Sequence, residues 1–256
     1  MKIRLFTLTV LVIMATSCAS RKDIAYFQDR PLSDGYIDSA PEQLIYKPDD
    51  ILTINVSAAD PIAAQPFNLS IVSESDDLIN ASGRTRMQTY LIDYNGNIEF
   101  PVLGTLHIAG ITRIALTAML KEKISEYAKD PIVNVRLVNF TITVIGEVSR
   151  PGTFTIQDER ISLPEALGLA NDLTIFGKRK NVLLIREVDG KKKFAKIDLT
   201  SVNTVSSPLY YLQQNDVIIV EQNNARIRSA NYNQNNAVLI SAIGTLTTIV
   251  AVFLIK

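Results

Sequence analysis

The order of apolar and polar residues predicts that the body of the chain begins with a small unit of strands. Residues 51–56 alternate apolar, mostly β-branched residues with polar ones, which is typical of a half-buried strand. Residues 89–94 and 97–100 are separated by Asn95-Gly96, the dipeptide that most strongly favours a tight hairpin turn. We therefore expect these two segments to pair as a hairpin, after an extended connection or insertion over residues 60–86.

A helix is predicted next, from Thr112 to the residues before Pro131. Thr112 is a favourable N-cap, and Asp130-Pro131 disfavours continuation of the helix. The apolar positions that recur at helical spacing are Leu116, Met119, Leu120, Ile124 and Tyr127. Residues 132–138 then alternate again, so we expect the unit to close with a strand.

The same kind of pattern follows in a second unit, with one helix among several strands. The predicted strands are residues 141–148, 153–156, 181–188, 193–197 and 216–220. Ser162, placed ahead of Pro164, predicts the start of a short helix over residues 163–170, and Asp189-Gly190 predicts a hairpin turn. Because strand pairs with one helix laid across them make each unit a small α+β domain, the predicted fold class is α+β.

The amino terminus carries the pattern of an export signal. A short basic start precedes an apolar stretch over residues 5–14, and small residues follow directly before Cys18. This arrangement resembles a bacterial lipobox, which predicts a signal peptide over residues 1–17 and lipidation of Cys18. The alternatives are an ordinary signal peptide and a short anchor helix with a buried cysteine. Residues 18–43 mix charged residues with Ser, Gly and Pro, and we expect a lipidated tether.

The carboxyl terminus is uncharged from Ala237 to Ile255, after an Asn- and Gln-rich stretch over residues 223–236 that we interpret as a polar linker. As a helix, the uncharged stretch would measure about 28 Å, close to the ~30 Å of a membrane hydrocarbon core. We therefore predict a transmembrane helix over residues 237–256. One stripe of small residues suits close helix packing or a lumen, and it consists of Ala237, Ser241, Gly244, Thr245, Thr248 and Ala251. The alternative is a simple anchor whose hydroxyls bond only to their own helix.

Composition excludes several kinds of chemistry. The 256 residues contain 26 basic and 26 acidic side chains, so the basic excess that nucleic-acid binding requires is absent. One cysteine and one histidine exclude intrachain disulfides, Cys/His metal sites and a Cys–His catalytic pair, and we expect no cofactor and no metal. Asp49 and Asp50 would point to opposite faces of a strand, which favours a turn or N-cap role over paired-carboxylate chemistry on glycans. His107 is expected to be a strand or surface residue without a ligand role.

Glycine and proline recur in an order that resembles a known family. The stretch Asp93-x-x-Gly96-x-Ile98-x-x-Pro101-x-x-Gly104, followed by Ile108-x-Gly110-x-Thr112, resembles the polysaccharide-export domain of bacterial outer-membrane capsule and exopolysaccharide translocons. Upstream, Tyr46 and Pro48-Asp49-Asp50 resemble the opening Tyr…Pro-Gly-Asp motif of that domain, with Asp49 in place of the usual glycine.

A second resemblance follows downstream. Val144-x-Gly146-x-Val148-x-x-Pro151-Gly152 is similar to the start of an SLBB domain, a soluble-ligand-binding β-grasp unit, and Asn171-Asp172 stand where that domain usually has Gly-Gly. Residues of these types fix turns and supply neither a nucleophile nor a general base. We therefore interpret the shared motif residues as structural: Asp93, Gly96, Pro101, Gly104, Gly110, Gly146, Pro151 and Gly152.

The two resemblances imply an organisation and a function. They imply a polysaccharide-export domain over residues 44–139 and an SLBB domain over residues 140–222, followed by the linker and the transmembrane helix. By this resemblance the chain is a lipoprotein of the Gram-negative outer membrane with its soluble domains in the periplasm. Identical subunits, eight in the family, would form a ring whose terminal helices cross the outer-membrane lipid.

The implied role is passive transport. The ring would export capsular polysaccharide or exopolysaccharide, working with an inner-membrane polysaccharide copolymerase and tyrosine autokinase, and the chain would make or break no bond itself. The alternative is a periplasmic glycan-binding or scaffold lipoprotein that forms no pore. An enzyme acting on glycans has no supporting set of residues in the sequence.

Overall fold

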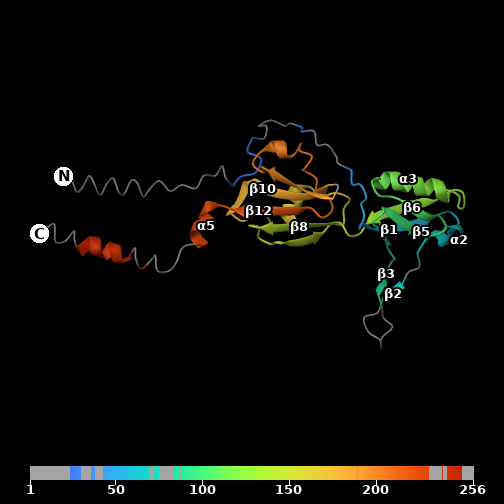
Figure 1. The fold of residues 1–256 in the computed structure, drawn as a ribbon, viewed down its shortest axis with the longest axis horizontal. Coiled ribbons are helices and arrows are strands. Elements are labelled where there is room, and N and C mark those ends of the chain that lie inside the picture. Colours follow the sequence, from blue (N-terminus) through green and yellow to red (C-terminus); the bar gives the residue numbers. More distant parts are fainter. Residues whose placement is uncertain are drawn as a thin grey trace, which may run out of the picture.

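A computed structural model describes residues 24–29, 36–37, 43–69, 72–74, 84–86, 88–188, 190–230, 238 and 241–249. Most of these residues pack around two separate hydrophobic cores. We call residues 43–138, around one core, the first domain, and residues 139–222, around the other, the second domain. Figure 1 shows the two domains side by side along the long axis of the molecule.

The first domain is built on a small antiparallel sheet in the order β4-β1-β7, with α3 packed against it. The hairpin β5–β6 lies beside this sheet, and β2 pairs with β3 in a separate ladder that points away from the domain (Figure 1). The elements are β1 (Ile51–Ser57), α2 (Pro61–Ala64), the 3-10 helix η2 (Gln65–Phe67), β2 (Val72–Glu74), β3 (Arg84–Arg86), β4 (Tyr90–Leu91), β5 (Asn97–Phe100), β6 (Gly104–His107), α3 (Arg113–Ile124) and β7 (Ile132–Leu137).

The predicted strands at residues 51–56 and 132–138 are confirmed as β1 and β7, which pair along their length. Alternate residues of both strands enter the core, while Asn55 and Asn134 stand opposite each other on the outer face. The helix begins as predicted, because the Thr112 side chain accepts a hydrogen bond from the Ala115 amide (3.3 Å). Each fully buried Leu or Ile on its inner face contributes about 1.5–3 kcal/mol.

Helix α3 ends earlier than the apolar spacing predicts. Its last helical residue is Ile124, and the Ser125 hydroxyl donates to the carbonyls of Lys121 and Glu122. Tyr127, predicted to face the core, is therefore 57% exposed. The Ser125 amide still bonds to the Lys121 carbonyl (3.0 Å), and residues 125–130 then leave the helix as turns and bends before Pro131 is reached.

The predicted hairpin between residues 89–94 and 97–100 is wrong in its pairing. Asn95-Gly96 does form a turn, in which Gly96 has φ +82° and the Asn97 amide donates to the Asp93 carboxylate (2.8 Å). However, β4 pairs with β1, and β5 pairs with β6 across residues 101–103. Burial decides this arrangement, because Ile98 and Leu106 meet across the β5–β6 ladder and both enter the core.

Two segments that the sequence assigns to connections contain helices. The predicted extended connection over residues 60–86 includes α2, whose N-cap Asp60 accepts from the Ile62 amide (3.0 Å), and Phe67 behind it is buried. The predicted polar linker over residues 223–236 includes α5 (Asn224–Ala230), where the Asn223 side chain accepts from the Arg226 amide (3.0 Å). Side-chain capping accounts for both starts.

The second domain contains a five-stranded sheet in the order β11-β10-β12-β8-β9, in which only the β12–β8 pair is parallel. Helix α4 starts at Ser162 as predicted, with Ser162 and Glu165 forming a reciprocal capping box. The predicted hairpin over residue 190 is confirmed as β10–β11. The elements are β8 (Thr141–Gly146), β9 (Gly152–Thr155), α4 (Leu163–Leu169), β10 (Gly177–Val188), β11 (Lys191–Ile197), the 3-10 helix η3 (Val202–Thr204) and β12 (Val217–Gln222).

The mixture of helices and sheets confirms the predicted α+β class. Of the predicted transmembrane helix, residues 238 and 241–249 are helical, and the remainder lies outside the described residues. Within the described part of the chain, no helix combines the length and the apolar character that crossing a membrane requires.

Gly146 at the end of β8 provides a test of the parallel pairing. Its φ is +94°, and an added Cβ would lie 2.1 Å from the Val220 carbonyl oxygen of β12. We expect Gly146→Ala to reduce the free energy of unfolding by about 3 kcal/mol or more. The matched control is Gly168→Ala in α4, where an added Cβ meets no described atom within 4 Å and helix propensity predicts a gain of up to ~1 kcal/mol. Denaturant unfolding of both variants measures the difference, and equal stabilities would contradict this account.

Candidate functional site

The junction between the two domains brings polar side chains from distant parts of the sequence together. Asn139, between β7 and β8, accepts from the Ile51 amide (2.9 Å) and donates to the Asp49 carbonyl (2.9 Å) through its side chain. Its own carbonyl accepts from the Gln214 side chain (2.6 Å) of the second domain. Leu44 and Leu137 pack against both cores. The junction is therefore held by apolar contacts and by hydrogen bonds.

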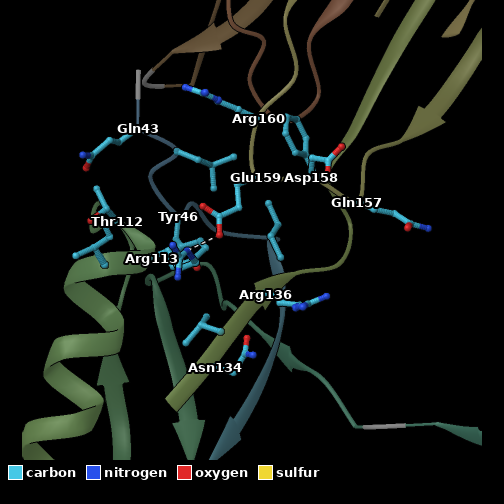
Figure 2. Close-up of a pocket in the computed structure, with 15 residues that line it drawn as sticks. Gln43, Tyr46, Thr112, Arg113, Asn134, Arg136, Gln157, Asp158, Glu159 and Arg160 are labelled. Carbon is cyan, nitrogen blue, oxygen red and sulfur yellow. Dashed lines mark ion pairs between the residues drawn. The ribbon is translucent and has the colours of Figure 1, made fainter. Parts of the chain in front are cut away.

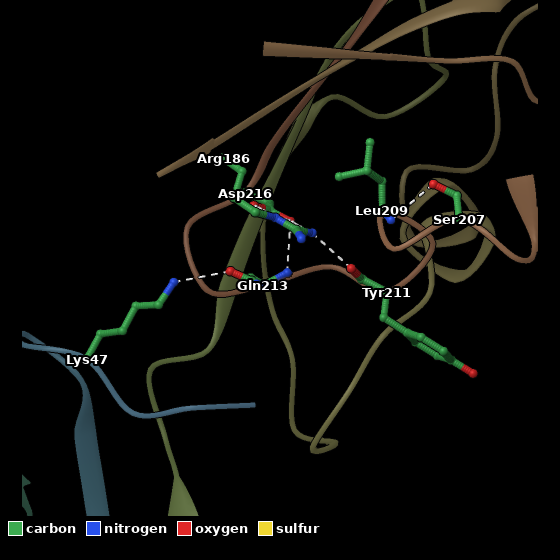
Figure 3. A network of polar contacts seen from close by, with 7 residues as sticks. All are labelled: Lys47, Arg186, Ser207, Leu209, Tyr211, Gln213 and Asp216. Atoms are coloured by element: carbon green, nitrogen blue, oxygen red, sulfur yellow. Dashed lines mark hydrogen bonds and ion pairs between the residues drawn. The ribbon is translucent and has the colours of Figure 1, made fainter. Parts of the chain in front are cut away.

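A buried ion pair in the second domain belongs to a polar network that Lys47 of the first domain joins, as Figure 3 shows. Arg186 of β10 is 5% exposed, and Asp216, one residue before β12, is 0% exposed. The Arg186 guanidinium donates to both carboxylate oxygens of Asp216 at 2.7–3.2 Å and to the Tyr211 carbonyl at 2.9 Å. The Asp216 carboxylate also accepts from the Gln213 amide (2.8 Å), and the Lys47 ammonium of the first domain donates to the Gln213 side chain (3.1 Å).

Sequence reasoning missed Arg186, although the pattern contained a signal for it. Positions 182, 184 and 186 share one face of β10 and all are buried, so an arginine continues an inward-facing apolar row. A charge in that position requires a partner, and Asp216 is the acid placed to provide it.

A groove opens at the junction, with a volume of about 660 Å³ (Figure 2). We call it the junction groove. Glu159 of the second domain reaches towards Arg113 at the start of α3, and their Oε1 and Nε atoms lie 2.6 Å apart. Both side chains are partly exposed, so this pair adds little stability, about 0–1 kcal/mol. The other polar lining residues are Gln43, Tyr46, Thr112, Asn134, Arg136, Gln157, Asp158 and Arg160.

A neighbouring depression of about 430 Å³ shares Asp158, Glu159 and Arg160 with the junction groove. It is also lined by the two tyrosines 210 and 211, whose rings meet edge to face at 5.1 Å. The Arg160 guanidinium lies over the Tyr211 ring at 5.1 Å. We call this depression the tyrosine depression.

Burial raises the pKa of two side chains in the segment that leads into β1, Tyr46, which lines the groove, and Asp50. Burial raises the pKa of Tyr46 to about 12. It also raises the pKa of Asp50, which is 2% exposed, to about 6, although the carboxylate accepts from the Lys47 amide (2.9 Å). Because the folded pKa lies above the unfolded value, protonated Asp50 favours folding below about pH 4, and this contribution is lost as the pH rises through 6. Asp49 has φ +71° in the same turn, as expected where a glycine is usual.

Part of the predicted tether contacts the second domain. The amides of Phe27 and Gln28 donate to the carbonyls of Leu199 and Thr200 (3.1 and 2.7 Å). The Asp29 carboxylate accepts from the Ser201 hydroxyl and the Val202 amide (2.7 and 2.6 Å). These bonds seat residues 24–29 against the loop that follows β11.

Tyr26 completes this contact, and we call Tyr26, Asp172 and Arg179 the clasp. The Tyr26 hydroxyl donates to the Asp172 carboxylate, and the Arg179 guanidinium lies over the Tyr26 ring at 5.4 Å. Burial and the neighbouring carboxylate raise the pKa of Tyr26. Asp172 and Asn171, which stand where Gly-Gly is usual, have φ of +65° and +55°. Residues 24–29 show no periodicity, so the sequence pattern carried no signal for the clasp.

The structure places the predicted motif residues in turns and at strand ends, away from the groove and the depression. Asp93 and Gly96 form the turn before β5, Pro101 and Gly104 bound the β5–β6 turn, and Gly110 donates its amide to Tyr46 (2.8 Å). Gly146 ends β8, and Pro151 and Gly152 lead into β9. Among the described residues, no group of three or more His, Cys, Asp or Glu side chains is placed to hold a metal ion.

The predicted small-residue stripe is described only in part. Ser241, Gly244, Thr245 and Thr248 are exposed on a helix, whereas Ala237, Ala251 and the predicted lipidation site Cys18 lie outside the described residues. The Thr245 hydroxyl donates to the carbonyls of Ser241 and Ala242 (3.0 and 2.9 Å), and the Thr248 hydroxyl donates to those of Gly244 and Thr245 (3.0 and 2.8 Å).

Comparison with known proteins shows two family matches in succession. Residues 38–138 match the polysaccharide biosynthesis/export protein family, and residues 141–220 match the SLBB domain. The chain is 28% identical over 177 residues to the EPS I polysaccharide export outer membrane protein EpsA of Ralstonia nicotianae, which covers 68% of this chain and 46% of that protein. It is 31% identical over 129 residues to the protein of the same name from Ralstonia solanacearum, covering 49% of this chain and 34% of that protein. The chain thus spans less than half the length of these relatives.

The buried ion pair predicts that removing one of its charges destabilises the protein much more than removing a charge at the surface. We expect Asp216→Ala to reduce the free energy of unfolding by about 3–5 kcal/mol, because Arg186 would remain buried without its partner. Glu221→Ala is the matched control, since it breaks the exposed pair with Lys178 (3.0 Å) and should cost less than ~1 kcal/mol. The double variant Arg186→Met/Asp216→Leu should recover most of the loss. Denaturant unfolding tests all three, and similar losses for the two single alanine variants would refute the interpretation.

The clasp predicts that the Tyr26 hydroxyl helps to hold residues 24–29 against the second domain. We expect Tyr26→Phe to accelerate amide hydrogen exchange at Phe27 and Gln28 about 10-fold, because a hydrogen bond to a charged acceptor contributes about 1.5–3 kcal/mol. Tyr36→Phe changes a fully exposed ring and should leave this exchange unaltered. Unchanged exchange in the Tyr26 variant would show that the backbone bonds alone hold the segment.

Proposed function

Because the chain belongs to the polysaccharide biosynthesis/export protein family, we propose that it is a subunit of an outer-membrane assembly that exports capsular polysaccharide or exopolysaccharide. The observation that carries this proposal is the succession of the two family domains over residues 38–220. The names of the two Ralstonia relatives, which are outer-membrane export proteins, support the same role and location. On this proposal the chain guides a polymer and makes or breaks no bond.

The proposal includes the arrangement of the subunit in the cell envelope. The chain is lipidated at Cys18 and has its two soluble domains in the periplasm, as the domains 44–139 and 140–222 that the sequence predicts. Residues 237–256 cross the outer membrane, and identical copies form a ring around the exported chain. An inner-membrane copolymerase with tyrosine autokinase activity supplies the polysaccharide. The seating of residues 24–29 on the second domain supports this arrangement, because it leaves only a few residues between that domain and Cys18.

The small-residue stripe is proposed as the contact between neighbouring terminal helices. The hydroxyls of Thr245 and Thr248 are bonded within their own helix, so they would enter a helix contact or a lipid environment without leaving an unpaired donor. Gly244, directly before Thr245 and one turn before Thr248, would allow close approach of a second helix.

A second candidate function is favoured by the junction groove. A periplasmic glycan-binding or scaffold lipoprotein would use such a polar groove without forming a pore. The two candidates differ in their need for the carboxyl-terminal segment, since only the export assembly requires residues 237–256 to cross the membrane.

Complementation in the producing strain tests the proposal. We expect deletion of the gene to abolish most surface polysaccharide, and expression of the full chain to restore it. A chain that lacks residues 237–256, expressed at the same level, should fail to restore it, because the assembly would lose its membrane passage. Surface polysaccharide is quantified by immunoblot or by uronic acid and hexose assay of shed material.

Each contrary result has a distinct meaning. Normal surface polysaccharide in the deletion strain would refute the export role. Full restoration by the truncated chain would refute the membrane passage and favour the glycan-binding candidate.

A further inference from the structure

We propose that the junction groove and the tyrosine depression together bind one extended segment of the polysaccharide. This inference rests on the proposed function, since it names a contact surface for the exported polymer. The two cavities share Asp158, Glu159 and Arg160, so one ligand chain can contact both by passing over this loop. Their volumes of about 660 and 430 Å³ lie in the range of ordinary ligand sites.

The side chains that line the groove suit a hydroxyl-rich ligand. Guanidinium, carboxylate and amide groups are planar and offer paired donors or acceptors, which match neighbouring hydroxyls on a sugar ring. Arg113, Asn134, Arg136 and Asp158 present all three types within one groove. Both signs of charge are present, so the lining is not specialised for a strongly anionic partner such as nucleic acid.

The groove continues onto an uncovered face of the first-domain sheet. Helix α3 packs against the opposite side of β7, and the outward residues of β1 and β7 are polar where they adjoin the groove. Asn55 stands opposite Asn134, and Thr53 stands opposite Arg136. A linear polymer therefore meets a strip of amide, hydroxyl and guanidinium groups that extends beyond the groove.

The tyrosine depression adds an aromatic surface. The carbon-bound hydrogens of a sugar ring pack against aromatic rings, which are large, rigid and amphipathic. Tyr211 is held from two sides, by Arg160 over its ring and by the edge-to-face contact with Tyr210. Glu165 is fixed by its capping bonds to Ser162 (2.7 and 2.8 Å). The depression is therefore formed before a ligand arrives, which reduces the entropy cost of binding.

A second copy of the chain is the rival occupant of this surface. The groove lining also contains Leu44, Val135, Leu137 and Phe140, but these side chains pack in or against the two hydrophobic cores. Ile114 is the large apolar side chain of the lining that is well exposed, whereas stable interfaces between subunits usually contain an apolar centre. The chemistry of the lining thus favours the glycan, and the experiment separates the two occupants.

The test uses the purified full-length chain in detergent and short oligosaccharides cut from the surface polysaccharide of the producing strain, with dextran oligosaccharides as the unrelated probe. Calorimetric titration of the wild type should detect binding of the strain's own oligosaccharides at concentrations up to ~1 mM. The double variant Arg160→Gln/Tyr211→Ala should bind at least 10-fold more weakly. Phe194→Ala is the matched control, because Phe194 is 64% exposed on β11, at the opposite edge of the sheet from β9, and its binding should equal that of the wild type.

A second variant controls for the case in which the first loses binding because it misfolds. Asn134→Ala/Arg136→Ala changes only exposed side chains of β7 and should also weaken binding several-fold with an unchanged melting temperature. Absence of wild-type binding, or equal binding by wild type and both double variants, would overturn the inference. A changed oligomer mass with unchanged binding would also overturn it and assign the surface to a contact between copies. The deletion strain tests the export role separately, so loss of surface polysaccharide without oligosaccharide binding would leave that role standing and remove only this site.

Discussion

The buried pair of Arg186 and Asp216 is the interaction on which the rest of the structure depends. It joins β10 to Asp216, the residue before β12, and it also bonds to the Tyr211 carbonyl and the Gln213 amide. Gln213 and Gln214, on the loop so fixed, then provide the hydrogen bonds to Lys47 and Asn139 at the junction. A buried ion pair contributes little net stability relative to an apolar pair of similar size, but it tolerates very few geometries. Its value here is geometric, because it holds the loop from which Gln213 bonds to Lys47 of the first domain and Gln214 bonds to Asn139.

Asp172, which stands where the SLBB motif usually has glycine, takes part in the clasp. Asn171 and Asp172 adopt positive φ, which is less costly for Asn and Asp than for other non-glycine residues. The carboxylate of Asp172 then accepts from the Leu173 amide (2.6 Å) and from the Tyr26 hydroxyl, bonds that glycine could not form. The substitution therefore links the amino-terminal segment to the second domain, and the strain of the turn is offset by those bonds.

Periodicity and capping in the sequence predicted the parts of the fold that depend on local interactions. The strands β1 and β7 follow from alternation, and the starts of α3 and α4 follow from the N-caps Thr112 and Ser162. Pairing between strands was less predictable, because β4 joins β1 through contacts some forty residues apart, which compete with the local turn at Asn95-Gly96. The groove and the clasp could not be predicted, since both consist of residues brought together from separate segments without any shared pattern. Arg186 is the exception, because its place in an inward-facing row marks it as a buried charge.

The chemistry of the junction is consistent with the demands of a long, mobile polymer. A surface along which a polymer passes must bind each segment strongly enough to admit it and weakly enough to release it, the same balance that governs ions in channels. A groove lined by both signs of charge, on a chain with 26 basic and 26 acidic residues, produces no strong field that would retain a charged polysaccharide. The weak, partly exposed pair of Arg113 and Glu159 can exchange its partners for sugar hydroxyls at small cost, whereas the buried pair holds the backbone of Tyr211, which lines the tyrosine depression. On the proposed function, this separation of an adaptable surface from a fixed support would allow the junction to contact many identical segments in turn without losing its geometry.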